Sequence, residues 1–271
     1  MSQPSFRDRV VIVTGASSGV GEAAARRFAA LGAKVVLAAR SAAKIEAVAK
    51  EIGGLAVATD VTSLPDLENL VQRTVEAHGR IDVLVNNAGA NSRGDLGDVA
   101  VDEIASVVDT NLKAPILLTR LALPHLKASK GVVVNVASIA GHVPLPGEST
   151  YCATKWGLRG FTFAVTEECR DAGVALTVVS PGPIATPFVL DDLDQTPDLV
   201  FSQPFLTAEQ VAEAVVACAA DRRRERAIPP STLWLAKLIG LAPWLQRWLR
   251  PMLEARGRKA KDEWRAKLAA R

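Results

Sequence analysis

The chain of 271 residues contains three cysteines, a single tyrosine and no run of about 20 mainly apolar residues. Cys152, Cys169 and Cys218 are an odd number without metal-ligand spacing. We therefore expect free thiols in a reducing compartment, and neither a disulfide framework nor a metal site. No apolar stretch precedes Val10, so the start of the chain does not resemble a secretory signal. These absences favour a cytoplasmic location.

The charge is distributed unevenly along the chain. The net charge is +3, yet residues 231–271 hold ten Lys and Arg against three Asp and Glu, so the preceding part is slightly acidic. A basic tail suggests a surface that faces a subunit, an anionic membrane or a nucleic acid, with a solvated helix as the alternative. Nucleic acid is disfavoured, because the rest of the chain is acidic and shows no recognition motif.

Short β-branched runs alternate with longer helical patterns, which is typical of βαβ units and a parallel sheet. Strands are predicted at 10–14, 34–38, 55–59, 83–85, 132–136, 176–179 and 227–228. Helices are predicted at 20–31, 43–52, from a cap at Ser63 to about 78, and at 101–126, 151–170 and 207–219. Pro115 and Pro124 should break or kink the fourth of these helices. With right-handed crossovers, the pattern predicts a single α/β domain with a Rossmann-like doubly wound parallel sheet, helices on both faces, and ligands at the carboxyl ends of the strands.

A glycine-rich turn lies between the first predicted strand and the first predicted helix. Residues 14–21 read TGASSGVG. Glycines permit a tight turn and let backbone N–H groups approach a pyrophosphate at a helix N-terminus. The candidate cofactor contacts in this turn are Gly15, Ser17, Ser18, Gly19, Val20 and Gly21. Taken alone, the motif could equally be a strand-to-helix turn without a ligand.

The second predicted strand is followed by Arg40 rather than by a carboxylate. A site for NAD would place Asp or Glu there to bind the adenosine ribose, but no carboxylate occurs before Glu46. A guanidinium could form a bidentate pair of hydrogen bonds with a 2′-phosphate and stack on adenine. We therefore favour NADP(H) as the cofactor. The alternative is that Arg40 is an ordinary solvated side chain.

Further candidate contacts follow the third and fourth predicted strands. Asp60 and Val61 follow the third strand, where a carboxylate can accept from the adenine amino group. Asn87, Ala88 and Gly89 follow the fourth strand and supply amides and small residues beside the cofactor. With the glycine turn, these residues occupy the ends of the first, third and fourth predicted strands.

The one tyrosine, Tyr151, stands four residues before Lys155, so a helix places both side chains on one face. A free phenol has a pKa of about 10, and a neighbouring ammonium typically lowers it by about 1 to 3 units. Ser138 lies thirteen residues earlier at a strand end and can bind a substrate oxygen, while the Asn111 amide could hold a water that resupplies protons. In isolation, the serine could be a turn residue, the asparagine a helix-bending residue and the lysine a surface charge.

Together these motifs resemble the short-chain dehydrogenase/reductase family over roughly residues 6–230. The residues that carry the resemblance are the glycine turn, Asp60, NNAG at 86–89, Asn111, Ser138, the Tyr151 and Lys155 pair, and PGPIAT at 181–186. The resemblance implies that Tyr151 donates a proton during reduction, Lys155 lowers its pKa and binds the nicotinamide ribose, Ser138 stabilises the carbonyl, and Asn111 organises a relay water. It further implies nicotinamide contacts from Pro181, Gly182, Ile184 and Thr186, and a homodimer or homotetramer.

The expected activity is that of an NADP(H)-dependent oxidoreductase, a carbonyl reductase or alcohol dehydrogenase. It would transfer a hydride between nicotinamide and a ketone, an aldehyde or a secondary alcohol, and NADP preference favours reduction. Alternatives are a non-catalytic NADPH-binding regulator, and an epimerase or dehydratase on the same fold.

The substrate pocket is predicted to be mostly apolar, which suits a steroid-, lipid- or aryl-ketone-like substrate. Its walls should come from residues 139–150, the segment after Gly89, and residues 188–205. The expected apolar residues are Val143, Leu145, Phe188, Val189, Leu190 and Leu193, with Asp191, Asp192 and Asp194 turned outward. Arg93 and His142 could hold a substrate group or be surface loop residues.

Residues 231–271 are predicted to be a Trp-rich, basic, amphipathic helical extension of a cofactor-binding and catalytic domain at 1–230. Residues 233–250 are rich in Trp and Leu but are interrupted by Lys237 and Arg247, among other residues, so they do not qualify as a spanning helix. The segment could pack on the protein or a partner subunit, lie in a membrane interface as a peripheral contact, or remain unstructured.

Overall fold

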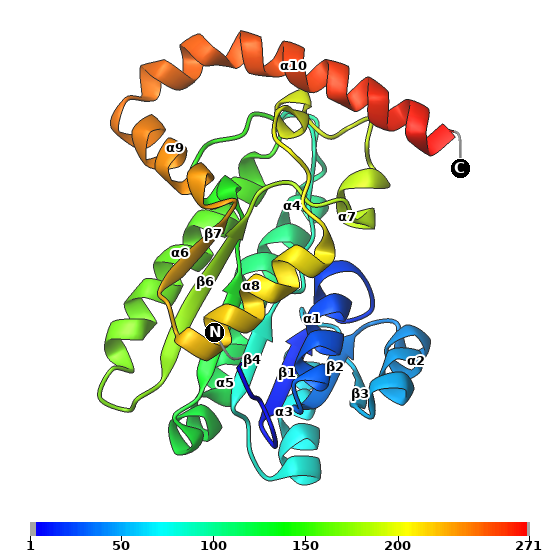
Figure 1. Cartoon of the computed structure of the whole chain (residues 1–271), viewed down its shortest axis with the longest axis vertical. Helices are drawn as coiled ribbons and strands as arrows, with labels where there is room; N and C mark the ends of the chain where they lie inside the picture. Colours follow the sequence, from blue (N-terminus) through cyan, green and yellow to red (C-terminus); the bar gives the residue numbers. More distant parts are fainter. Residues whose placement is uncertain (1–3, 270–271) are drawn as a thin grey trace.

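A single sheet of seven parallel strands forms the centre of the computed structural model, which describes residues 4–269 (Figure 1). The strands are β1 Val10–Thr14, β2 Lys34–Ala39, β3 Leu55–Ala58, β4 Val83–Asn86, β5 Val132–Val136, β6 Ala175–Pro181 and β7 Glu225–Ile228. Their order is β3-β2-β1-β4-β5-β6-β7, so the direction of winding reverses between β1 and β4. This arrangement confirms the predicted doubly wound parallel sheet, whose ligands bind at such a reversal point.

Helices cover both faces of the sheet (Figure 1). They are α1 Gly19–Ala30, α2 Ala42–Ile52, α3 Leu64–His78, α4 Val101–Val108, α5 Ala114–Ser129, α6 Ser149–Glu168, α7 Pro187–Leu190, α8 Ala208–Asp221, α9 Pro230–Leu241 and α10 Pro243–Ala269. Helices α1, α2 and α8 pack on one face, and α3, α5 and α6 on the other. Along β1, Val11 and Val13 enter the first core while Val10 and Ile12 enter the second, because successive side chains alternate across a strand. Burial on both faces explains why the strands are continuously apolar.

The helix predicted at 101–126 is interrupted near the first of its two prolines. A π-helical turn at Asp109–Lys113 separates α4 from α5, and the amide of Ala114 donates to the carbonyl oxygen of Asp109, five residues earlier. Pro115, which has no N–H, follows in the first turn of α5, where the missing donor costs least. Helix α5 continues past Pro124 to Ser129, so the expected break occurs at the first proline and not at the second.

A buried polar chain ties α6 to the middle of the sheet. Asn86 and Asn135 face each other in the β4–β5 register, and Nδ2 of Asn86 donates to Oδ1 of Asn135 at 2.8 Å. Nδ2 of Asn135 in turn donates to the hydroxyl of Thr162 on α6, also at 2.8 Å. All three side chains are buried, so these bonds replace lost hydration. This series of hydrogen bonds thereby fixes α6 relative to the ends of β4 and β5.

The C-terminal extension forms two helices, α9 and α10, and α10 passes over the carboxyl ends of the strands (Figure 1). Within residues 4–269, no helix combines the length and the apolar character that crossing a membrane requires. In the same range, no three or more His, Cys, Asp and Glu residues are grouped to hold a metal ion. The three cysteines are free thiols, and all three are buried.

Replacing Asn135 by alanine should lower the free energy of unfolding by about 1–3 kcal/mol, because the buried amide of Asn86 loses the closer of its two acceptors and the Thr162 hydroxyl loses its donor. Urea unfolding followed by circular dichroism measures the change. Thr177→Val is the matched control, since the Thr177 hydroxyl is equally buried but makes a longer 3.3 Å bond to a strand carbonyl. Equal stability losses in the two variants would contradict the importance of this polar chain.

Candidate active site

A cavity of about 960 Å³ opens along the carboxyl ends of the strands and extends beneath α9 and α10. Almost all the residues predicted for the site line it. They are Gly15, Ser17, Ser18, Gly19, Val20, Arg40, Asp60, Val61, Asn87, Ala88, Gly89, Ser138, Tyr151, Lys155, Pro181, Gly182, Ile184 and Thr186. Two predicted residues, Gly21 and Asn111, are not among the lining residues.

The glycine turn after β1 interlocks with the loop after β4. Gly15 has φ +65°, and a Cβ there would lie 2.9 Å from the Cα of Ala88. A Cβ on Gly21 would collide with the carbonyl oxygen of Gly15, so this glycine permits close packing and does not face the cavity. The hydroxyl of Thr14 accepts from the amides of Asn87 and Ala88 at 3.0 and 3.1 Å. The two segments therefore form one rigid floor.

At one end of the cavity lie Arg40 and Asp60. The Arg40 side chain is exposed and makes no hydrogen bond or ion pair to another described residue. Bonds from the backbone and hydroxyl of Thr62 lower the pKa of Asp60, and the nearby Arg40 charge lowers it further. The amide of Asp60 itself donates to Asp66. This end of the cavity thus presents one cation beside a firmly ionised carboxylate.

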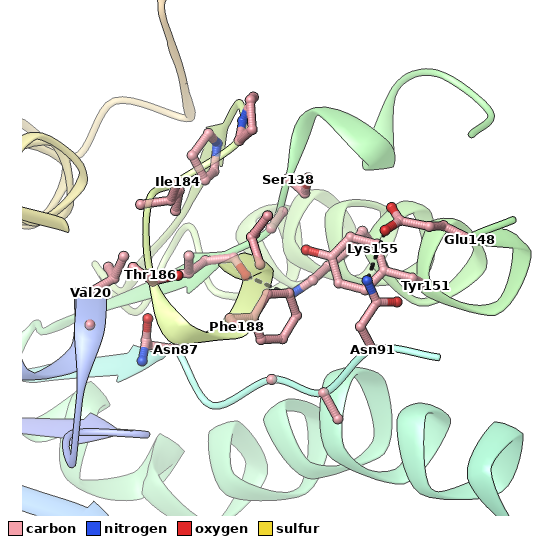
Figure 2. A pocket seen from close by; sticks show the side chains of 18 of the residues that line it. Val20, Asn87, Asn91, Ser138, Glu148, Tyr151, Lys155, Ile184, Thr186 and Phe188 are labelled. Atoms are coloured by element: carbon pink, nitrogen blue, oxygen red, sulfur yellow. Dashed lines mark hydrogen bonds between the residues drawn. The ribbon is translucent and has the colours of Figure 1, made fainter. Parts of the chain in front are cut away.

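At the other end, Ser138, Tyr151 and Lys155 come together (Figure 2). Ser138 follows β5 and caps a short 3₁₀ turn, where its hydroxyl accepts from the amide of Ala140 at 3.1 Å. Tyr151 and Lys155 share one face of α6, and the lysine Nζ lies 5.5 Å from the phenol ring centroid. The ammonium donates to the carbonyl oxygen of Val136 at 3.0 Å. The sequence spacing therefore predicted this convergence correctly.

The expected lowering of the phenol pKa is not found in this arrangement. Burial raises the pKa of Tyr151 well above its usual value, and the charge of Glu148 raises it further, whereas a hydrogen bond with Ser138 opposes the shift. Burial lowers the pKa of Lys155 to about 8. Desolvation, which disfavours the charged phenolate, is the largest cause of this shift, and the neighbouring ammonium is directed at a backbone carbonyl.

Asn111 lies in the π-helical turn and is fully buried. Its Nδ2 donates to the carbonyl oxygen of Ala90 at 2.8 Å and to the hydroxyl of Thr154 at 3.2 Å, while its Oδ1 accepts from the amide of Ala90. Both amide hydrogens are therefore engaged. The side chain fixes the loop after β4 against α6, which differs from the predicted role of holding a water. π-Helical turns often occur at functional sites.

The segment after β6 closes the cavity against the glycine turn. The amide of Gly182 donates to the carbonyl oxygen of Ile228 at 2.8 Å, and Ile184 pairs with Leu206 in a parallel bridge. A Cβ on Gly19 would lie 3.3 Å from the Thr186 methyl group. Figure 2 shows Ile184 and Thr186 on the same side of the cavity as Val20. The predicted nicotinamide contacts are therefore adjacent to the predicted pyrophosphate contacts.

Glu148 and Asn91 were not singled out from the sequence, but both fall within the predicted pocket walls, and both line the cavity near Tyr151 (Figure 2). Glu148 is 5% exposed and accepts from Nδ2 of Asn91 at 2.9 Å. Burial raises the pKa of Glu148, while Asn91 and the guanidinium of Arg93 act in the opposite direction. The available signal was a carboxylate three residues before Tyr151, just ahead of α6.

The predicted apolar walls are partly confirmed. Val143, Leu145, Phe188 and Val189 line the cavity, but Leu190 and Leu193 are not among the lining residues. The three aspartates at 191, 192 and 194 are exposed, as expected. They are nevertheless not all free, because Asp192 pairs with Arg93 at 3.0 Å and Asp194 pairs with Arg265 at 2.8 Å.

The two predicted polar exceptions behave differently from each other. His142 faces away from the cavity, with Nε2 2.8 Å from Glu225, so the prediction that it could hold a substrate group is wrong. Arg93 does line the cavity and its side chain is 3% exposed. Its Nη2 donates to the carbonyl oxygen of Phe188 at 2.9 Å, and its Nη1 pairs with Asp192. Arg93 therefore holds α7 in place.

A dinucleotide-sized cavity at the reversal point of a doubly wound sheet, ending at a tyrosine and lysine on one helix, is the arrangement of a Rossmann-type oxidoreductase. Comparison with known proteins defines the family. The model of the short chain dehydrogenase family matches residues 9–196. The chain therefore belongs to this family of oxidoreductases.

Relatives and solved structures agree with that assignment. An uncharacterized oxidoreductase of Staphylococcus saprophyticus is 35% identical over 203 residues, which are 72% of this chain and 82% of the relative. A dehydrogenase/reductase SDR family protein 7-like from Anopheles gambiae is 32% identical over 261 residues, which are 89% of this chain and 81% of that protein.

Two crystal structures resemble the fold. One is a 3-ketoacyl-(acyl-carrier-protein) reductase from Brucella melitensis complexed with NADH, with a TM-score of 0.76 and 30% identity over 83% of this chain and 98% of that chain. The other is a metagenomic short-chain oxidoreductase in complex with NADP, with a TM-score of 0.70 and 34% identity over 82% of this chain and 96% of that chain.

Because Tyr151 is the only tyrosine, the near-ultraviolet absorbance of phenolate titrates this side chain alone. We expect a midpoint above that of free tyrosine, because the phenol is buried beside Glu148. Glu148→Gln removes a negative charge that disfavours phenolate, so the midpoint should move to lower pH.

Glu168→Gln, which removes an exposed carboxylate at the far end of α6, should leave the midpoint unchanged. A midpoint in Glu148→Gln that stays fixed or rises, with circular dichroism showing a folded protein, would contradict the electrostatic role of Glu148.

Proposed function

We propose that this protein is an NADP(H)-dependent oxidoreductase that transfers a hydride between nicotinamide and a ketone or aldehyde, or the corresponding alcohol. The observation that carries the proposal is one cavity with Ser138, Tyr151 and Lys155 at one end and Arg40 at the other. Residues 1–230 would bind the cofactor and catalyse the reaction, and residues 231–271 would form an extension over the cavity. We further propose a homo-oligomer that is located in the cytoplasm.

The shape of the cavity floor fits a dinucleotide. Gly15 and Gly19 have φ values of +65° and +57°, and the added Cβ of alanine at Gly15 would strike the neighbouring backbone. The N-terminus of α1 begins at this turn, and such helix ends bind phosphate through free N–H groups. The similar Brucella and metagenomic enzymes were solved with NADH and with NADP, which supports a nicotinamide dinucleotide here.

Each part of the cofactor has residues that would hold it. The glycine turn, from Gly15 through Val20, would bind the pyrophosphate. Asp60 and Val61 would contact the adenine, and Arg40 the 2′-phosphate. Asn87, Ala88 and Gly89 would line the groove, Lys155 would bind the nicotinamide ribose, and the segment containing Pro181, Gly182, Ile184 and Thr186 would contact the carboxamide.

The catalytic side chains supply the proton and the orientation, while a bound nicotinamide supplies the hydride. Ser138 would donate a hydrogen bond to the substrate carbonyl oxygen, and Tyr151 would transfer its phenolic proton to the same oxygen. The raised pKa of Tyr151 keeps the phenol protonated, which is the form that a proton donor needs. Lys155, with a pKa of about 8, would stabilise the phenolate formed as the proton leaves.

The substrate end of the cavity supports a hydrophobic carbonyl compound. Val143, Leu145 and Val189 line it, together with Ile239 and Leu253 from the extension. Such walls bury a steroid-, lipid- or aryl-ketone-like substrate more favourably than a polar one.

NADPH should be used in preference to NADH. Arg40→Ala should lower kcat/KM for NADPH roughly 10- to 100-fold, the range expected for losing charge-assisted hydrogen bonds to a phosphate, and should change NADH use little. Lys44→Ala, which removes an exposed charge on α2 outside the cavity, is the control and should alter neither value. Equal or better use of NADH by the wild type would contradict the assignment of NADP(H).

Tyr151→Phe should retain NADPH affinity while turnover falls at least roughly 10²- to 10⁴-fold, since the general acid is lost. NADPH oxidation is followed with small, aromatic and steroidal ketones, and cofactor binding is measured by fluorescence. Unchanged turnover in the variant would contradict Tyr151 as the acid. Tight NADPH binding by the wild type without turnover of any ketone would indicate a regulator, or an epimerase or dehydratase, instead.

A further inference from the structure

Helices α9 and α10 have an apolar stripe on the side facing away from the protein. The stripe consists of Trp234, Leu238, Leu241, Trp244, Trp248 and Met252, each between 55% and 85% exposed. Within each helix these residues are three or four apart, so they share one helix face. The opposite side is also apolar, because Ala236, Ile239 and Leu253 line the cavity. We call the six exposed residues on the outward side, from Trp234 to Met252, the outer stripe.

The outer stripe is a concentrated feature of the surface. The other large apolar side chains that are exposed in the described part of the chain are spread from Leu64 to Phe188. Isolated exposed apolar residues are normal, but six large ones within nineteen residues of sequence concentrate apolar surface, and such surfaces mark interaction sites. Three tryptophans in the group add large rings with a polar edge.

The segment that carries the outer stripe has only positive charges. No Asp or Glu occurs between Glu225 and Glu254, whereas Lys237, Arg247 and Arg250 do. Arg250 pairs with Glu254 at 2.6 Å, but Lys237 and Arg247 form no ion pair with any described residue. The Lys237 ammonium lies 5.5 Å from the ring centroid of Trp234. Two cations without an acidic partner therefore accompany the apolar stripe.

The distal part of α10 is built differently, because one of its lysines is buried against the loop after α7. Lys261 is 5% exposed and its Nζ donates to the carbonyl oxygens of Asp194 and Thr196 at 3.0 and 2.8 Å. Trp264 packs on Phe205 at a centroid distance of 5.2 Å. The distal part thus anchors the extension, and the outer stripe lies on α9 and the first turns of α10, on either side of the corner that projects from the body (Figure 1).

We propose that the outer stripe docks on an anionic lipid surface. The tryptophans would lie at the headgroup level, where amphipathic rings are favoured, and Lys237 and Arg247 would contact anionic headgroups. A second copy of the chain is a poorer occupant. A twofold interface brings the same patch of each subunit together, and here that would oppose like charges.

The docked orientation has a consequence for the substrate, and this consequence rests on the proposed function. The same two helices separate the lipid surface from the cavity, and a helix with its side chains is about 10–12 Å across. A lipophilic carbonyl compound dissolved in the membrane would therefore reach the cavity by passing the edge of α9 or α10.

The test is flotation of the full-length protein with vesicles of phosphatidylcholine and phosphatidylserine in equal parts. We expect binding that weakens at high salt and is lower on phosphatidylcholine alone. The double variant Trp244→Ser, Trp248→Ser should bind roughly tenfold or more weakly. The matched control is Leu96→Ser with Val101→Ser, which removes two similarly exposed apolar side chains elsewhere and should bind as the wild type does.

Absence of wild-type binding to the anionic vesicles, or equal binding by the tryptophan variant, would overturn the proposal. Sedimentation of the same variant as a smaller oligomer than the wild type would assign the outer stripe to a second copy instead. Vesicle binding needs no turnover, so failure of the proposed reductase activity and failure of the docking are separate outcomes.

Discussion

The contact between the glycine turn after β1 and the loop after β4 is the constraint on which the site depends. One hydroxyl, that of Thr14, accepts from two amides of that loop and donates to the carbonyl oxygen of Val85, so it bridges the two strands at the point where the sheet reverses its winding. The approach is possible because Gly15 and Gly21 lack Cβ atoms that would strike backbone atoms. Because this floor is fixed, the groove along the glycine turn and the end of α6 that carries Tyr151 keep a constant position relative to each other.

Much of this frame could be predicted from the sequence, because it depends on local rules. Strands β1 and β5 have the predicted bounds, since continuous β-branched runs buried on both faces are hard to mistake. The pairing of Tyr151 with Lys155 also follows from helix geometry alone. The site at the strand ends could be predicted because parallel strands bring their carboxyl ends to one edge of the sheet.

The features that could not be predicted depend on long-range packing. The high pKa of Tyr151 arises from burial and from Glu148, neither of which sequence spacing reveals. His142 turns away because Glu225, 83 residues later, offers a buried carboxylate. The sequence predicted an amphipathic helical extension. It did not show that the extension has two apolar sides, because one of them is identified only by the cavity that it lines.

The anchoring of α10 has a consequence for how the cavity is shaped. Lys261, near the end of the chain, holds the backbone at Asp194 and Thr196, and this backbone leads into the outer wall of the substrate end. The proposed proton donor and its partners come from residues 138–155, a separate part of the chain. The extension therefore shapes one wall of the cavity through Ile239 and Leu253 while contributing none of these side chains, so a different extension would change the shape of the cavity and leave Tyr151 where it is.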